Sequence, residues 1–212
     1  PSITPVRMAS LLPGAGAELK LVRKGDQMVV ALGEQALPQV TQRMDVLRNR
    51  YGDRFAEMAL SDFVRGKETI PVTAELLVLR STTIDQHMES TPEMALRLIH
   101  ESLKSIRVAI HKLRGLGFKD AFVVTDHGFY LNTATEAGDV CAKPQGNWLN
   151  LHERMLLGDG TADAGSFVLP AAQLGIRGDF GQVACPRAMV PYRAGEWYFH
   201  GGASLQEAVV PV

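Results

Sequence analysis

The sequence lacks the features that mark membrane, secreted and polyanion-binding proteins. No apolar run is long enough to cross a bilayer, and no signal peptide opens the chain. The only two cysteines, Cys141 and Cys185, show no Cys-x-x-Cys spacing, which favours a reducing, cytoplasmic setting. A formal net charge of −1 gives no electrostatic reason to expect a nucleic acid as partner.

What the sequence does contain is the composition of a folded domain. Its 212 residues are 46% hydrophobic and 21% charged, which suits one globular domain, with or without an insertion. The chain begins Pro-Ser-Ile-Thr, without methionine, and stops at Val212 in what reads as a strand. We therefore expect it to be a segment of a longer protein.

The first third predicts a short helix at its start and, over 18–64, elements that we interpret as an excursion from the main sheet. Thr4 suits a helix N-cap and Pro5 the first helical position. The predicted elements are a helix from there to Pro13-Gly14, a hairpin over 18–32 that turns at Lys24-Gly25-Asp26, a helix over 38–51 capped by Gly52, and a short helix over 55–64.

The middle of the chain predicts a β-α-β unit with parallel strands. A strand over 75–84, a helix over 91–116 and a strand over 120–125 follow one another. Thr91, Pro92 and Glu93 suit the helix start. One apolar face of this helix is expected to carry Leu96, Ile99, Leu103, Ile106, Ile110 and Leu113. His100 and His111 flank that face and are interpreted as structural boundary residues.

Both predicted strands end in metal-binding residue types. Thr125-Asp126-His127-Gly128 follows one strand, and a segment with Asp85, His87 and Glu89 follows the other. Ligands of open α/β sheets lie beyond the carboxyl ends of the strands. A carboxylate beside a neutral imidazole suits a divalent metal. The simpler alternatives are a polar turn at Asp126-His127 and a solvated loop at 85–89.

The remaining third predicts a covering segment and a last strand. Residues 129–191 are rich in Gly, Asp and Pro, with apolar runs at 166–169 and 182–184, and are expected to form an insertion or lid. We interpret four residues here as turn and surface residues, namely Asp159, Asp163, Asp179 and His152. A short strand over 196–200 ends in His200, and 204–207 opens a helix or a final strand.

Several of these motifs together resemble the PglZ domain of the alkaline phosphatase superfamily, which is associated with BREX-type phage defence. The matching pieces, in the superfamily's order, are Pro-Ser-Ile-Thr-Pro at 1–5, Ile84-Asp85, Thr-Asp-His-Gly-Phe at 125–129 and Phe-His-Gly-Gly-Ala-Ser-Leu-Gln-Glu at 199–207. The resemblance implies an α/β fold, a three-layer sandwich with a mostly parallel central sheet. Residues 1–212 would form one such domain, with 129–191 inserted as the lid or small subdomain.

The resemblance also implies a binuclear metal-dependent phosphatase or phosphodiesterase. Thr4 matches the nucleophile, Asp126 and His127 match ligands of one ion, and Asp85 and His200 match ligands of the second. Two divalent ions are expected, with zinc first and manganese or magnesium as alternatives. Arg7, one turn into the first helix, is a candidate phosphate contact, and a plain surface arginine is the alternative.

The chain departs from the family pattern in two places. The superfamily carries Asp-x-x-x-His after the first aspartate, whereas Glu89 stands four residues after Asp85 and His87 comes too early. Either Glu89 or His87 is then the second ligand of that segment. The superfamily's further aspartate ligand lies on a strand before the nucleophile, so we expect it ahead of Pro1.

Three hypotheses follow for function. The first is a phosphoryl hydrolase acting on a phosphate ester, preferably a nucleotide or nucleic-acid phosphodiester, beside defence proteins such as a DNA methyltransferase. The second is a non-catalytic scaffold of a defence complex with a degenerate metal site. The third is a plain α/β domain with accidental motifs, in which Asp126 and His200 would lie far apart. None of the three involves a membrane.

Overall fold

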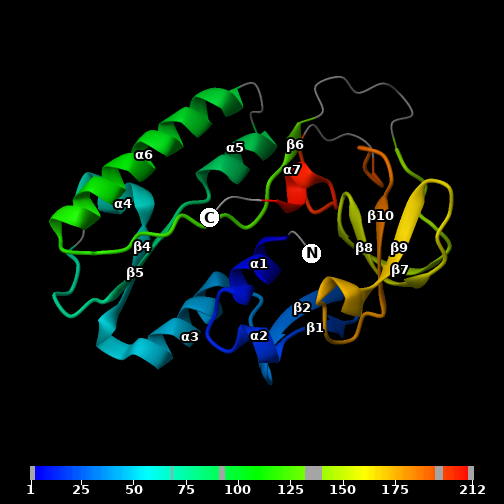
Figure 1. Cartoon of the computed structure of the whole chain (residues 1–212), viewed down its shortest axis with the longest axis horizontal. Coiled ribbons are helices and arrows are strands. Elements are labelled where there is room, and N and C mark those ends of the chain that lie inside the picture. Colours follow the sequence, from blue (N-terminus) through cyan, green and yellow to red (C-terminus); the bar gives the residue numbers. More distant parts are fainter. Residues whose placement is uncertain (1–2, 68, 91–93, 132–139, 194–197, 210–212) are drawn as a thin grey trace. The chain divides into compact units, whose positions relative to one another are not determined.

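The computed structural model describes residues 3–67, 69–90, 94–131, 140–193 and 198–209, without the side chains at 89–90, 95–96 and 151. The chain divides into two compact units. The first unit comprises residues 1–43 and 124–212, and the second comprises residues 44–123. Helix α3 (Val40–Tyr51) carries the chain from the first unit into the second. Figure 1 shows the elements of both.

The first unit opens with two short helices and a hairpin sheet. Helices α1 (Thr4–Ser10) and α2 (Ala15–Glu18) precede the antiparallel strands β1 (Leu19–Lys24), β2 (Gln27–Leu32) and β3 (Gln35–Ala36). The predicted hairpin is confirmed, because Lys24 pairs with Gln27 across the two-residue turn. Gly25 in this turn has a φ of 60°, a left-handed conformation that glycine adopts without a steric penalty.

A four-stranded antiparallel sheet occupies most of the segment predicted to be a lid. Its strands are β7 (Gly146–His152), β8 (Met155–Gly160), β9 (Ser166–Pro170) and β10 (Gln182–Pro186), in the order β7-β8-β10-β9. The 3-10 helix η3 (Ala171–Leu174) follows β9. Strands β9 and β10 contain the two apolar runs named from sequence. The hairpin β7–β8, which turns at Glu153-Arg154, was not predicted.

This sheet packs a small core of its own. The buried cluster contains Cys141, Leu156, Ala184 and Tyr192, with Trp148 packed against it. Burial raises the pKa of the Cys185 thiol, which lies on β10, to about 12. Both cysteines are free thiols, as their spacing implied. That this sheet acts as a lid stays a prediction.

The rest of the first unit places the two histidine motifs near each other. Strand β6 (Tyr130–Leu131) follows Asp126-His127-Gly128 and pairs antiparallel with β11 (Tyr198–Phe199), which leads into His200. Helix α7 (Leu205–Ala208) comes next and has a capping box between Ser204 and Glu207. The C-terminal motif therefore continues as a helix, which was one of its two predicted outcomes. Residues 196–197 of the predicted strand lie outside the described part of the chain.

The second unit holds the one parallel strand pair of the described residues. After η1 (Gly52–Arg54), strand β4 (Phe55–Ala59) pairs in parallel with β5 (Leu76–Arg80), and α4 (Leu60–Arg65) lies between them in sequence. The predicted helix over 55–64 is thus wrong in its first half, because residues 55–59 gain ladder hydrogen bonds from β5. Residues 55–59 are therefore part of a sheet, whereas the sequence interpretation placed them in an excursion from the main sheet.

Residues 120–125, predicted as the second parallel strand, form no strand in the structure. Phe122 is 81% exposed, and Val123 and Val124 are exposed as well. An apolar run becomes a strand only where a neighbouring backbone pairs with it, and among the described strands β5 pairs with β4 instead. The predicted β-α-β unit is therefore wrong in its last element.

Two helices follow β5. Helix α5 (Thr83–Ser90) replaces the predicted strand end and loop, and α6 (Ala95–Gly115) confirms the long helix. The expected start of α6 at 91–93 lies outside the described residues. Its buried face is rotated from the predicted one. Ala109 joins Met58 and Phe63 in the core of this unit, and Leu113 of the predicted face packs against them. Leu103 and Ile110 of that face are exposed.

The architecture is therefore α/β, with one parallel strand pair and otherwise antiparallel pairing among the described strands. The mostly parallel sheet expected from the sequence is not formed by these residues, since apart from β4 and β5 every strand pairs antiparallel with its neighbour. The three-layer arrangement stays a prediction. Within the described residues, no helix is both long and apolar enough to span a membrane.

Candidate metal and nucleophile site

Thr4 lies against Asp126 in the first unit. Ile3, with extended backbone angles of φ −124° and ψ 143°, is the N-cap of α1, so the predicted cap at Thr4 is wrong by one residue. The Thr4 hydroxyl instead donates a short hydrogen bond to Oδ2 of Asp126. The candidate nucleophile and a candidate metal ligand, far apart in sequence, are thus in direct contact.

The Asp126 and His127 side chains converge. Oδ1 of Asp126 accepts a hydrogen bond of 3.1 Å from the His127 amide, which fixes the carboxylate. Nδ1 of His127 lies 3.1 Å from the Gly128 carbonyl oxygen. A carbonyl can only accept, so Nδ1 carries a proton. Nε2 lies 3.5 Å from Oδ2 of Asp126, so a cation between them would contact both atoms.

His127 also contacts His200, as the metal-site hypothesis requires. The two rings are parallel, at an interplanar angle of 3°, with centroids 3.8 Å apart, and each residue is 7% exposed. The accidental-motif hypothesis, which placed Asp126 and His200 far apart, is therefore wrong, because His200 stacks directly on the neighbour of Asp126.

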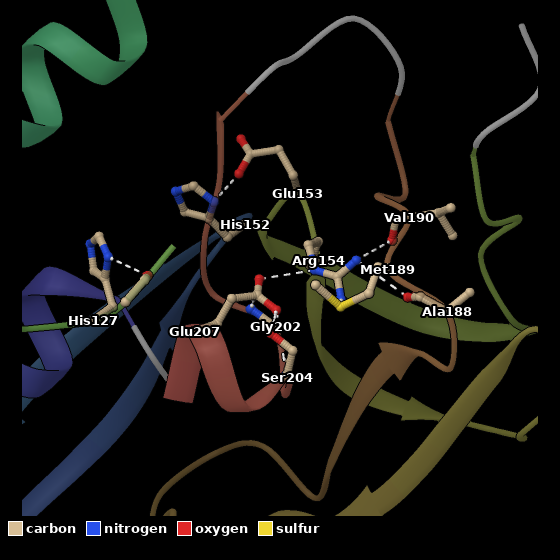
Figure 2. A network of polar contacts seen from close by, with 11 residues as sticks. His127, His152, Glu153, Arg154, Ala188, Met189, Val190, Gly202, Ser204 and Glu207 are labelled. Carbon is tan, nitrogen blue, oxygen red and sulfur yellow. Dashed lines mark hydrogen bonds and ion pairs between the residues drawn. The ribbon is translucent and has the colours of Figure 1, made fainter. Parts of the chain in front are cut away.

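A third imidazole, which we expected at the surface, joins this stack. The His152 ring lies 3.7 Å from that of His200, at an interplanar angle of 44°. Its side chain is only 26% exposed, and Nδ1 contacts the Glu153 carboxylate (Figure 2). Burial, together with the neighbouring His200 and His127, lowers the pKa of His152 to about 3. His152 is therefore neutral at pH 7, and it is the candidate site residue that sequence reasoning missed.

A local signal for His152 did exist in the sequence. The apolar residues Leu149 and Leu151 precede it, and Met155-Leu156-Leu157 follow after the polar pair Glu153-Arg154. Two apolar runs separated by a two-residue turn are typical of a hairpin. His152 would then stand at a strand end, the same relation that drew attention to Asp126 and His127.

A buried ion pair holds the loop that carries His200. The carboxylate of Glu207 accepts hydrogen bonds from Arg154 Nε at 2.9 Å, the Gly202 amide at 3.0 Å and the Ser204 hydroxyl at 2.6 Å. Arg154 in turn donates from Nη1 to the Val190 carbonyl at 2.7 Å. Figure 2 shows the carboxylate between the guanidinium group and the 202–204 loop. This network ties α7 to the β7–β8 turn next to His152.

Neighbouring atoms approach the backbone so closely at two positions of these motifs that only glycine fits there. A Cβ at Gly128 would lie 1.8 Å from the Gln206 carbonyl oxygen, because the Gly128 amide donates to the Glu207 carbonyl at 3.0 Å. At Gly202, a Cβ would lie 2.6 Å from a carboxylate oxygen of Glu207. The segments 125–129 and 199–207 thus pack backbone to backbone, which explains why both motifs need glycine.

Arg7 makes a contact other than the predicted one. Its Nη2 donates to the carbonyl oxygen of Ala208 at 3.0 Å, which links α1 to the end of α7. This hydrogen bond keeps the start of the chain, and with it Thr4, against the C-terminal motif. Contact of Arg7 with a phosphate stays a prediction.

The remaining candidates lie in the second unit, on α5. Asp85 is in the first turn of this helix, and Asp85 and His87 are half-buried. Positions four apart lie on one side of a helix and positions two apart do not, so the helical backbone favours Glu89 over His87 as the companion of Asp85. Their part in one site with Asp126 and His200 stays a prediction.

Comparison with known proteins identifies the family. The model of the BREX system PglZ alkaline phosphatase-like domain matches residues 1–212, the whole chain. No curated protein sequence and no solved structure matches it. Of the motifs that carry the family resemblance, those of the first unit, which contain Thr4, Asp126 and His200, are packed together. The chain therefore belongs to the PglZ family, as an alkaline phosphatase-like domain of a BREX phage-defence system.

Proposed function

We propose that this domain is a metal-dependent phosphoryl hydrolase, a phosphatase or phosphodiesterase, that works in phage defence. The observation that carries the proposal is the convergence of three potential ligand atoms in the first unit. The Thr4 hydroxyl donates to Asp126 Oδ2, and His127 Nε2 lies 3.5 Å from the same oxygen. A hydroxyl, a carboxylate and an imidazole form a donor set that fits a divalent cation.

The stacked histidines support two ions. The lone pair of an imidazole nitrogen lies in the ring plane, so two parallel rings cannot direct their lone pairs at one ion. The separation of 3.8 Å between His127 and His200 is comparable to the roughly 3.5–4 Å between the ions of two-metal hydrolases. His127 would hold the first ion with Asp126, and His200 the second with Asp85. Zinc fits these nitrogen ligands, with manganese or magnesium as the oxygen-preferring alternatives.

Thr4 would act as the nucleophile. Asp126 accepts its hydroxyl proton, while the Thr4 oxygen forms a bond to phosphorus as the bond to the leaving alcohol breaks. Water then hydrolyses the threonyl phosphate. The bound ions would lower the pKa of the attacking hydroxyl and stabilise the leaving oxygen. The hydrogen bond of Arg7 to Ala208 would keep α1, and so Thr4, in position.

Membership of the family, and not the surface charge, supports the proposed substrate class. The net charge of −1 provides no attraction for a polyanion. A nucleotide or nucleic-acid phosphodiester is the proposed substrate, and other proteins of the defence system, such as a DNA methyltransferase, are the proposed partners. A cytoplasmic location accords with this role.

Hydrolysis of bis-p-nitrophenyl phosphate by the full-length protein, with added zinc or manganese, tests the proposal. Thr4→Ala and Asp126→Ala should each lower the rate by at least about 100-fold. Thr161→Ala, at an exposed threonine of the same unit, is the matched control and should leave the rate unchanged. Equal rates in the wild type and both site variants would contradict the proposal. Stoichiometric metal without hydrolysis would favour the scaffold hypothesis.

A further inference from the structure

His152 stands out among the side chains that the proposed function does not use. It is the last residue of β7, it is mostly buried, and its ring contacts that of His200. We propose that His152 is a further metal ligand, which binds the same ion as His200, and that Glu153 orients it. This inference rests on the proposed function, since it assigns a new ligand to the same centre.

The ring contacts determine which ion His152 would share. The planes of His127 and His200, inclined by only 3°, do not meet near the site, so these two rings serve different ions. The planes of His152 and His200 are inclined by 44°, with centroids 3.7 Å apart. Because His127 is nearly parallel to His200, the His152 plane is inclined to both by a similar angle, and the angle alone does not choose between them. The direct contact of the His152 ring with the His200 ring does, so we assign His152 to the ion of His200.

Glu153 supplies the second contact that a metal-binding histidine normally has. Its carboxylate contacts Nδ1 of His152, and a carboxylate only accepts, so Nδ1 is the nitrogen that would carry a proton in a metal-bound ring. Nε2, which faces away from Glu153, is then the nitrogen left for the ion. Metal-binding histidines almost always donate their other ring proton to a carboxylate or carbonyl, which fixes the tautomer and the ring orientation.

The surrounding backbone holds His152 in place. Gly201 has a φ of 92°, and a Cβ there would lie 2.9 Å from Cβ of His152, so the chain passes the histidine closely. Arg154, two residues further on, is held by Glu207 and by the Val190 carbonyl. Both the strand end that carries His152 and the loop that carries His200 are therefore fixed to one buried ion pair, as a preorganised ligand pair requires.

The test measures zinc binding by the metal-free, full-length protein. Zinc alone is titrated against a chromogenic chelator, and X-ray absorption of the loaded protein counts the imidazoles per zinc. His152→Gln should weaken the affected zinc site by at least about 100-fold and remove one imidazole from its coordination sphere. Glu153→Gln should weaken the site by about 10- to 100-fold while the imidazole count stays the same. His111→Gln, at an exposed histidine of α6, is the control and should change neither.

The possible outcomes separate this inference from the proposed function. Unchanged zinc affinity and imidazole count in folded His152→Gln would overturn the inference, while hydrolysis by the wild type would leave the function standing. Zinc binding that depends on His152, in a protein without hydrolytic activity, would support the inference and refute the function. Circular dichroism checks folding. If His152→Gln does not fold, an unchanged affinity in Glu153→Gln overturns the inference.

Discussion

Replacing Arg154 by methionine should destabilise the first unit strongly, because it leaves the Glu207 carboxylate buried without its cation. Arg154 is 2% exposed and Glu207 is fully buried, so water cannot compensate for the lost partner. Breaking a buried ion pair from one side costs about 3–5 kcal/mol. Total stabilities are about 5–15 kcal/mol, so this is a large share of the free energy of unfolding.

Urea unfolding, followed by circular dichroism in the presence of a chelator, measures this loss without a contribution from bound metal. For a slope of about 2–3 kcal/mol per molar urea, the midpoint should fall by about 1–2.5 M. The matched control is Arg54→Met, in the exposed pair that Arg54 makes with Glu75 at 3.1 Å. Exposed pairs contribute at most about 1 kcal/mol, so its midpoint should move by well under 1 M.

The reasoning would be refuted if Arg154→Met and Arg54→Met shifted the midpoint equally. The double variant Arg154→Met/Glu207→Gln sharpens the test, because it leaves no uncompensated charge. It should lose less stability than the two single changes added together. Since Gly202 and Ser204 are also bound to the Glu207 carboxylate, Arg154→Met should weaken zinc binding at His200 as well.

Two further predictions concern backbone packing and thiol chemistry. Gly128→Ala should lower the thermal unfolding midpoint by several degrees or prevent folding, because its Cβ would overlap the Gln206 carbonyl oxygen. Gly16→Ala, in α2 with open space around the position, should instead stabilise by up to about 1 kcal/mol, and a lower midpoint in this control would contradict the argument. Cys185, with its pKa raised to about 12 by burial, stays a thiol between pH 7 and 9, so a chromogenic disulfide reagent should label it only after unfolding. Rapid labelling of Cys185 in the native protein would refute its burial.

The sequence by itself determined the elements whose signals are local. The hairpin at Gly25-Asp26 and the helices around 40–51 and 95–115 follow from turn chemistry, periodicity and capping, which act between near neighbours. It also determined the family, because the motifs around Asp126 and His200 occur in order along the chain. Strand partners were not determined in this way, since hydrogen bonds between strands join residues far apart. Residues 55–59 therefore became a strand against expectation, and 120–125 did not.

Only the tertiary structure decided how the site is assembled. No local pattern places the Thr4 hydroxyl on Asp126, and none shows that His152 packs on His200. These contacts arise because Gly128 lets α7 approach the Asp126 segment and because Glu207 binds Arg154 in the hairpin that carries His152. The chain order fixes which residue types are available for metal chemistry. The buried ion pair and the close backbone contacts, which depend on the whole fold, decide which of them meet.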